Sequence, residues 1–324
     1  MNVLEIKNLS ARYFSSKGIV HALDNIDLDL EKGKCIGIVG ESGCGKSTLA
    51  LSIMDIMDPH EGEVKADMIS FYLNRGKKMV DMIALSQAQK RKLRGNYISL
   101  ILQDPYNALN PVIKIGDQLK EIYFVHNPKK KNVYPVIKRK LREVHLDYCD
   151  RIMDSYPHQL SGGMLQRVCI AAALINNPEI LIADEPTSNL DVTIQKKIIE
   201  NLKNLKQKHN LSMIFITHNL NLVSEFADEI YILYAGEIVE KGPSYSIFGN
   251  ACHPYTRGLI KALPKLGVSK KIKPIPGSVP EMNKVIRGCR FSSRCKNMEP
   301  ECEAGDIELK QAGKNHYVRC IKRS

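Results

Sequence analysis

A nucleotide-phosphate loop is the clearest chemical signal in the sequence. Residues 40–47 read GESGCGKS and match the pattern G-x-x-x-x-G-K-[ST] in full. Glycines allow successive backbone N–H groups to converge on phosphate oxygens, and the N-terminus of a following helix adds positive potential. Lys46 supplies a mobile positive charge for the β- and γ-phosphates, and the Ser47 hydroxyl is suited to bind Mg²⁺. The candidate nucleotide-binding residues of this segment are Gly40, Glu41, Ser42, Gly43, Cys44, Gly45, Lys46, Ser47 and Thr48.

Two adjacent carboxylates form the second signal. Asp184 and Glu185 follow the apolar run at 180–183. Neighbouring side chains diverge, so we expect separate tasks. Asp184 would bind Mg²⁺, directly or through water, and Glu185 would polarise the attacking water as a general base. A solvated acidic loop is the alternative for this pair taken alone, but an intact phosphate loop in the same chain favours nucleotide hydrolysis.

The elements that must position these groups read as an α/β fold. The continuous apolar run at 35–39 predicts a strand buried on both faces. A helical pattern over 46–57 follows the phosphate loop, which argues against an ordinary glycine-rich turn. Between about 114 and 158 the spacing predicts helices, so we expect parallel βα units with a helical insert. Further strands are expected at 3–9, 26–30, 180–183, 213–217 and 230–234, and further helices at 193–208 and from 219.

The composition excludes several classes of protein. With 324 residues, 44% of them hydrophobic and 25% charged, the chain is neither disordered throughout nor too short for about two domains. Nine cysteines are too sparse for a disulfide scaffold and predict a reducing compartment. No apolar run reaches the roughly 18–20 residues of a membrane-spanning helix, and Glu5 and Lys7 lie where a signal peptide would be apolar. We therefore expect a soluble protein that reaches a membrane only through a partner.

A third motif carries a family resemblance. Residues 160–164 read LSGGM, so that a serine and two glycines open the helix expected around 166–174. With the phosphate loop and the carboxylate pair, this motif resembles the signature of the ATPase subunit of an ATP-binding-cassette (ABC) transporter. The resemblance implies a phosphate-loop NTPase fold that hydrolyses two ATP molecules at a dimer interface. The residues that would face the ATP of the partner subunit are Ser161, Gly162, Gly163, Met164 and Asp191.

The same resemblance assigns roles to single residues. Gln103 matches the glutamine that senses Mg²⁺ and joins the core to the helical insert, and His218 matches the switch histidine at the γ-phosphate. Tyr13 matches the aromatic residue that stacks on adenine, with Phe14 or core packing as alternatives. The catalytic set is then Glu185, His218 and Gln103, and the Mg²⁺ set is Ser47, Gln103 and Asp184.

Four residues depart from the family pattern without removing a group that the chemistry needs: Cys44, Met164, Asn189 and Asn219. We therefore expect a competent site. We hypothesise that the nearby helix dipole lowers the pKa of Cys44 and makes its thiol open to alkylation. An inert thiol is the alternative.

The C-terminal part resembles the oligopeptide, dipeptide and nickel importer branch of the family. The matching strings are HPYT at 253–256, ALP at 262–264, IPGSVP at 275–280 and GCRFSSRC at 288–295. The resemblance implies uptake of peptides or nickel-type cargo at the cytoplasmic face of the cell membrane. It also implies a second ATPase subunit, related or identical, two transmembrane permeases and, indirectly, an extracellular substrate-binding protein.

This branch assignment implies two domains. An ABC ATPase domain would span 1–250, with a helical subdomain at about 104–170, and a C-terminal extension would span 251–324. The alternative function is a non-transport ABC ATPase, either of the DNA repair or chromosome type or a regulator of iron–sulfur assembly. The insert of about sixty residues is short for the coiled coils of the first kind, and the extension argues against the second.

The net charge of +12 would suit nucleic acid or an anionic membrane. The positive excess is concentrated at 74–96, 128–142 and 265–324, and the remaining residues carry a net negative charge. We interpret the basic stretches as local patches of a membrane-docked protein and expect no nucleic-acid partner.

Four of the nine cysteines fall close together near the C-terminus: Cys289, Cys295, Cys302 and Cys320. Four thiolates in a short segment could bind Zn²⁺ or an iron–sulfur cluster. The spacing lacks the C-x-x-C pairs of zinc ribbons. The resemblance favours a 4Fe–4S cluster, with Zn²⁺ or free thiols as alternatives.

Overall fold

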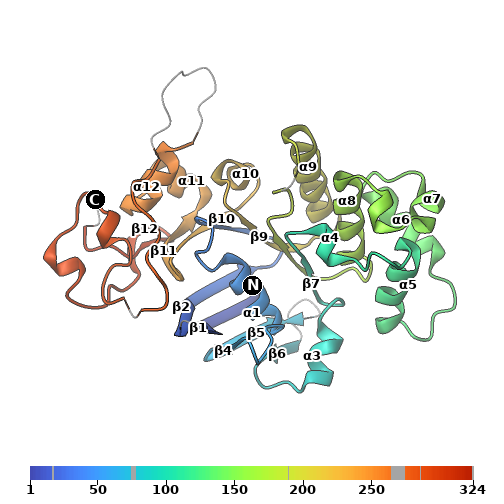
Figure 1. The fold of residues 1–324 in the computed structure, drawn as a ribbon, viewed down its shortest axis with the longest axis horizontal. Coiled ribbons are helices and arrows are strands. Elements are labelled where there is room, and N and C mark those ends of the chain that lie inside the picture. The colour runs from blue at the N-terminus through green and yellow to red at the C-terminus, as the bar shows by residue number, and fades with distance from the viewer. Residues whose placement is uncertain (17, 74–77, 189, 264–273, 285, 323–324) are drawn as a thin grey trace. The chain divides into compact units, whose positions relative to one another are not determined.

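A computed structural model describes the chain except residues 17, 74–77, 189, 264–273, 285 and 323–324 (Figure 1). Two residues named above, Asn189 and Pro264, therefore lie outside the described residues. The chain forms two compact units, each described here by itself. The first unit comprises 1–3, 30–34 and 71–214, and the second comprises 4–29, 35–70 and 215–324.

The described strands are β1 (Asn2–Ser15), β2 (Gly18–Glu31), β3 (Cys35–Val39), β4 (Gly62–Lys65), β5 (Met68–Tyr72), β6 (Lys78–Asp81), β7 (Ile98–Ile101), β8 (Ile180–Asp184), β9 (Ser212–Thr217), β10 (Glu229–Tyr234), β11 (Glu237–Pro243), β12 (Lys310–Gly313) and β13 (His316–Val318). The described helices are α1 (Lys46–Met54), α3 (Gln87–Leu93), α4 (Pro105–Ala108), α5 (Ile115–His126), α6 (Tyr134–Glu143), α7 (Cys149–Asp154), α8 (Gly162–Ala173), α9 (Val192–His209), α10 (Leu220–Ser224), α11 (Ser244–Gly249) and α12 (Pro254–Lys261), with short 3₁₀ turns η1 (Pro157–Gln159), η2 (Ser292–Arg294) and η3 (Pro300–Cys302).

The second unit is organised around β3. All five residues of this strand are buried, as its continuous apolar sequence predicts. β3 pairs in parallel with β10, and the order continues through β11, β13 and β12, all antiparallel to their neighbours. A Cβ on Gly37 would lie 2.0 Å from Cγ1 of Val223, so the glycine lets α10 pack directly against the strand. A separate sheet contains β2 next to β1, and β4 pairs with β1 in antiparallel register.

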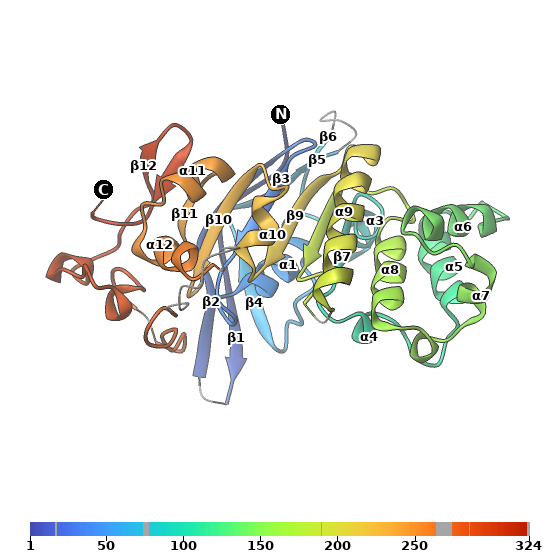
Figure 2. The same ribbon diagram turned by 90° about the horizontal axis from the view of Figure 1, so that it is seen from above.

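The first unit joins a small parallel sheet to a helical cluster. β7 and β8 pair in parallel, with Ile101 opposite Ala183 at their carboxyl ends. Figures 1 and 2 both show α5, α6, α7 and α8 gathered together. α5, α6 and α7 lie within 114–158, where the spacing predicts helices, and α8 follows that stretch. Within the described residues, no helix is long and apolar enough to cross a membrane.

The predicted α/β class is confirmed, and the structure adds elements that the pattern does not reveal. The predicted helix over 46–57 ends at Met54, because Asp55 takes a left-handed conformation with φ 50° and caps it. Beyond residue 253 regular patterning fades in the sequence, yet this part contains α12, β12 and β13. β13 has three residues and pairs with β11, so its stability depends on the sheet and not on a local pattern.

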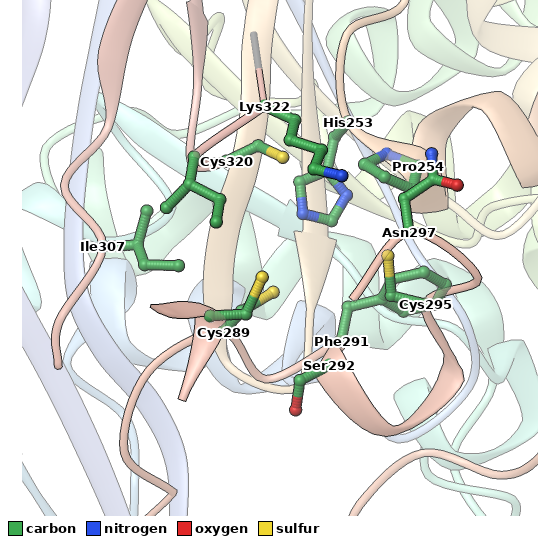
Figure 3. Close-up of a pocket in the computed structure, with 12 residues that line it drawn as sticks. His253, Pro254, Cys289, Phe291, Ser292, Cys295, Asn297, Ile307, Cys320 and Lys322 are labelled. Carbon is green, nitrogen blue, oxygen red and sulfur yellow. The ribbon is translucent and has the colours of Figure 1, made fainter. Parts of the chain in front are cut away.

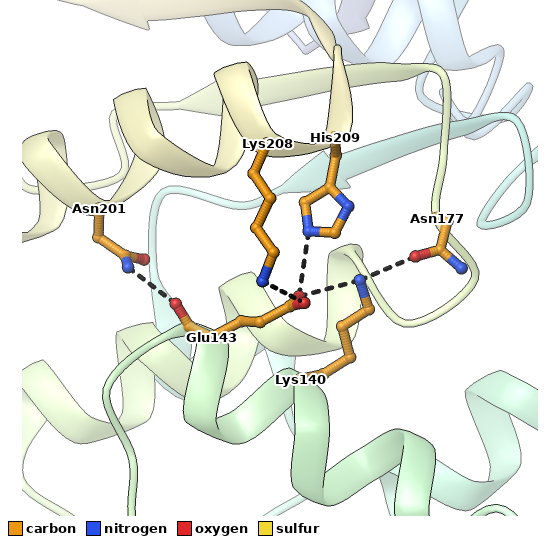
Figure 4. Close-up of polar contacts among 6 residues, drawn as sticks. All are labelled: Lys140, Glu143, Asn177, Asn201, Lys208 and His209. Atoms are coloured by element: carbon orange, nitrogen blue, oxygen red, sulfur yellow. Dashed lines mark hydrogen bonds and ion pairs between the residues drawn. The ribbon is translucent and has the colours of Figure 1, made fainter.

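A buried ionic cluster ties α6 to α9 within the first unit (Figure 4). The Glu143 carboxylate accepts hydrogen bonds from Lys208 Nζ (2.9 Å) and Lys140 Nζ (3.1 Å), and His209 Nε2 lies 3.1 Å away. Asn201 Nδ2 donates to the Glu143 main-chain oxygen at 2.9 Å. Burial alone would raise the pKa of Glu143, but the hydrogen bonds from Lys208 and Lys140 outweigh it and lower the pKa to about 2.

Replacing this carboxylate tests the cluster. We expect Glu143→Gln to lower the free energy of unfolding by about 3 kcal/mol at neutral pH, because it leaves the buried Lys140 ammonium without its counter-charge. A depressed carboxyl pKa stabilises the folded state above the unfolded value, so the difference from the parent should shrink as pH falls from 4.5 towards 2. Urea titrations of the parent and the variant across this pH range measure the difference in the free energy of unfolding. The exposed Glu121→Gln serves as the control, and equal losses in both variants would contradict this account.

Candidate functional site

The phosphate loop lies between β3 and α1 in the second unit. Gly45 precedes the helix with φ 104°, a backbone conformation open to glycine, and a Cβ there would lie 2.4 Å from the Ala22 carbonyl oxygen. Gly43 also has a positive φ of 79°. A Cβ on Gly40 would meet the Leu233 carbonyl oxygen at 2.2 Å. The three glycines of the motif are therefore required by the backbone path of the loop and by its close contacts.

Lys46 folds back over the loop that precedes it. Its side chain is buried, and Nζ donates to the carbonyl oxygens of Gly40 (3.0 Å) and Glu41 (2.9 Å). This places the ammonium beside the loop backbone, where the sequence predicts a phosphate ligand. Ser42 and Ser47 are exposed, whereas Thr48 is buried at the start of α1.

Tyr13 lies next to this helix start. Its hydroxyl is 3.4 Å from Thr48 Oγ1, and its ring is partly buried. Phe14, the alternative, is 48% exposed. His218 is exposed and directly follows β9, in the same unit as the loop.

The hypothesis about Cys44 is wrong. Its thiol is fully buried beneath the loop, with Sγ 2.5 Å from the position that a Cβ on Gly40 would take. Burial raises the pKa of Cys44 to about 11, and the positive charge of Lys46 only partly opposes that effect. The predicted lowering of its pKa fails because desolvation of the thiolate exceeds the local positive potential, and this burial favours the inert-thiol alternative.

In the first unit, the carboxylate pair and Gln103 lie at one edge of the small sheet. Asp184 ends β8 and is buried, Glu185 follows it, and Gln103 follows β7 as an exposed residue. Because Ile101 pairs with Ala183 in parallel register, both strands deliver these side chains at their carboxyl ends. Glu185 has φ 43°, a left-handed conformation that costs a non-glycine residue roughly 1 kcal/mol.

The signature residues and Asp191 also come together in the first unit. Ser161 caps α8 and accepts a hydrogen bond from the Met164 N–H at 3.4 Å. Asp191 caps α9 through the N–H groups of Thr193 and Ile194. Cβ atoms on Gly162 and Gly163 would contact Leu190 and Ile194, so the two helix starts pack side by side.

The four C-terminal cysteines line one cavity of the second unit (Figure 3). Cys289, Cys295, Cys302 and Cys320 reach it from separate turns, and His253 contributes a buried ring to the same cavity. Gly288 lets two of these turns approach closely, because a Cβ there would lie 2.2 Å from the Cys302 carbonyl oxygen. Burial raises the pKa of Cys289 to about 11 and also raises that of Cys320.

A second cluster of possible metal ligands, which the sequence analysis did not identify, is accounted for by hydrogen bonds among its own residues and their neighbours. Glu240, Cys252 and His316 are all buried, with ligand atoms within 4.8 Å of one another. The Glu240 carboxylate already accepts hydrogen bonds from the N–H groups of Cys252 (2.6 Å) and His253 (2.9 Å), and His316 Nε2 lies 2.7 Å away. These contacts join β11 and β13 to the start of α12.

Sequence reasoning also missed Tyr255 and Arg294 as neighbours of the phosphate loop. The Glu41 N–H donates to the Tyr255 hydroxyl at 3.0 Å, and Arg294 Nη1 donates to both Glu41 carboxylate oxygens. Both residues stand in the strings that carry the branch resemblance. Their contacts cross more than 200 residues of sequence, so no local spacing signals them.

Comparison with known proteins assigns the chain to a family. It belongs to the ABC transporter family, which matches residues 23–188. Residues 239–302 match the family described as the oligopeptide/dipeptide transporter, C-terminal region. With the phosphate loop and the carboxylate pair, this identifies the chain as an ATPase of the ABC type.

Full-length relatives agree with both matches. The chain is 40% identical over 321 residues to the oligopeptide transport ATP-binding protein AppD of Bacillus subtilis (strain 168), covering 98% of this chain and 96% of AppD. It is 41% identical over 320 residues to the dipeptide transport ATP-binding protein DppD of the same organism, covering 98% and 94%. A solved structure of the ATP-binding cassette MJ0796 bound to ADP and Pi matches with a TM-score of 0.64 and 27% identity, covering 74% of this chain and 98% of that one.

Proposed function

We propose that this chain is the ATP-hydrolysing subunit of an ABC importer that takes up dipeptides or oligopeptides. The match of residues 239–302 to the oligopeptide/dipeptide transporter C-terminal region carries this proposal. The two Bacillus relatives are named for oligopeptide and dipeptide transport, which favours peptides over the nickel-type cargo that the branch resemblance allows. The same match argues against a non-transport ABC ATPase.

We assign separate residues to ATP binding, to Mg²⁺ binding and to hydrolysis. Residues 40–48 bind the phosphates of ATP, with Lys46 at the β- and γ-phosphates and Tyr13 against the adenine. Ser47, Gln103 and Asp184 hold Mg²⁺. Glu185 accepts a proton from the attacking water, and His218 contacts the γ-phosphate. The placement of Gln103 at the same strand ends as the carboxylates supports the Mg²⁺ assignment.

We propose that the signature residues act on ATP held by a partner ATPase subunit. Ser161, Gly162, Gly163 and Met164 open α8, whose N-terminus offers backbone N–H groups to an anion. Asp191 lies beside them, as a shared contact surface requires. The partner is a related ATPase or a second copy. Two permeases and an extracellular binding protein complete the system, with this chain at the cytoplasmic face of the membrane. The proposed ATPase domain is 1–250, and 251–324 is its extension.

Mutation of Glu185 tests the hydrolytic role. We expect Glu185→Gln to lower ATP turnover at least a hundredfold, because it removes the general base. ATP-induced dimerisation should survive, since the amide preserves the shape of the side chain. Phosphate release and size-exclusion chromatography measure the two properties. Glu200→Gln, an exposed change on α9 in the same unit, provides the control. Hydrolysis at the parent rate in Glu185→Gln would remove Glu185 as the base.

We propose further that the four cavity cysteines hold a 4Fe–4S cluster, and the sulfur positions support iron over zinc. Among the described residues, no three of these thiols place their sulfur atoms within 4.8 Å of one another. A tetrahedral zinc site with Zn–S bonds of about 2.3 Å needs sulfur atoms about 3.8 Å apart. Each thiolate of a 4Fe–4S cluster binds a different iron, so wider spacing is required. The cluster would crosslink the turns of the extension.

Metal analysis distinguishes these alternatives. After anaerobic purification we expect about four iron atoms per chain and little zinc. Cys302→Ser should lose the iron, because its thiol is one of the four in the cavity. Cys149→Ser, at a buried cysteine of α7 in the other unit, should retain it. Stoichiometric zinc without iron in the parent protein would contradict the cluster.

A further inference from the structure

Arg294 is a buried cation that reaches from the C-terminal extension to the phosphate loop. Its side chain is 4% exposed, and Nη1 donates to Glu41 Oε2 at 3.0 Å and Oε1 at 3.2 Å. The other donors of the guanidinium are also engaged. Nε donates to the Pro276 carbonyl (2.9 Å) and Nη2 to the Ile275 carbonyl (3.3 Å), while Nη1 also lies 3.3 Å from the Tyr234 hydroxyl. The position of the cation is therefore fixed by the extension itself.

The extension also holds the main chain of Glu41. The Tyr255 hydroxyl accepts the Glu41 N–H at 3.0 Å. Tyr255 is fully buried, with its ring centroid 4.6 Å from that of Tyr234 and 5.5 Å from that of Phe291. An aromatic cluster of this kind leaves the hydroxyl little freedom to move. Tyr255 thus holds the backbone of Glu41, and Arg294 holds its side chain.

Glu41 in turn contacts the lysine of the phosphate loop. Its carbonyl oxygen accepts a hydrogen bond from Lys46 Nζ at 2.9 Å. A continuous series of contacts therefore runs from Arg294 to Glu41 and from Glu41 to Lys46. The ion pair also matters for charge, because an unpaired Glu41 carboxylate would repel the phosphates of a nucleotide bound at this loop.

We propose that Arg294 is a positioning residue for ATP binding. Together with Tyr255, it fixes Glu41 and thereby the loop backbone and Lys46 in the arrangement that receives the phosphates. The extension then sets the ATP affinity of the cassette, in addition to any role in transport. The inference rests on the ATP site alone and does not require metal at the cysteines, although Arg294 directly precedes Cys295.

The matched control for this proposal is Arg290. It lies in the same segment, is also buried, and pairs with Asp24 and Glu237 instead of a phosphate-loop residue. Substituting either arginine by alanine removes a buried cation near the cysteines. Only Arg294→Ala removes the contact with Glu41.

Binding of a fluorescent ATP analogue and steady-state hydrolysis test the proposal on the full chain. We expect Arg294→Ala to raise Kd and KM about tenfold, in keeping with loss of a charge-assisted contact, with kcat changed less than threefold. Arg290→Ala should leave both near the parent values. Arg294→Lys should recover part of the affinity, because it restores the charge without the planar fork.

A double variant separates positioning from general damage. If Arg294 acts through Glu41, then Glu41→Gln should partly rescue Arg294→Ala, because it removes the carboxylate left unpaired. If Arg294→Ala does not fold, the conservative variants Arg294→Lys and Tyr255→Phe test the proposal instead. Tyr255→Phe removes only the hydroxyl that accepts the Glu41 N–H. We expect each of these two variants to raise Kd about threefold. Equal affinities in the Arg294 and Arg290 variants, additive effects with Glu41→Gln, or unchanged Kd in both conservative variants would overturn the proposal.

Discussion

The close approach of the phosphate-loop backbone to its neighbouring strands is the constraint on which the rest of this structure depends. Where this loop passes the carbonyl oxygens of Leu233 in β10 and Ala22 in β2, its backbone leaves no room for a side chain. Gly40 and Gly45 meet carbonyl oxygens at distances that exclude a Cβ, and Gly45 also needs its left-handed conformation. β3, which leads into this loop, is buried throughout, and α1 begins where the loop ends.

Such a loop needs support from outside itself, and the extension provides it in the second unit. The strands β11, β13 and β12 continue from β10, so the C-terminal residues form part of the same sheet as β3. The Glu240 hydrogen-bond network fixes the start of α12, which carries Tyr255. Cys289 and Cys295, on either side of Arg294 in sequence, both line the cysteine cavity. Residues of the extension, which lie far from the phosphate loop in sequence, thus contact Glu41 in the structure.

The sequence predicts the chemistry better than it predicts its support. The phosphate loop, the carboxylate pair and the signature are local strings, and their strand and helix neighbours follow from local periodicity. Cys44 shows the limit, because the helix dipole is visible in the sequence whereas the burial that outweighs it is not. Arg294 and Tyr255 show another. Their roles arise from tertiary contacts across more than 200 residues, and strands as short as β13 exist only because a sheet edge receives them.

Peptide uptake is the central claim, and reconstitution tests it most directly. The chain would be assembled in lipid vesicles with the proposed partners, two permeases and a second ATPase subunit, together with a binding protein and a labelled peptide. We expect the peptide to move from the side of the binding protein into the compartment that contains this chain, and only when ATP is present in that compartment. ATP hydrolysis that proceeds at the full rate without any peptide movement would contradict the account.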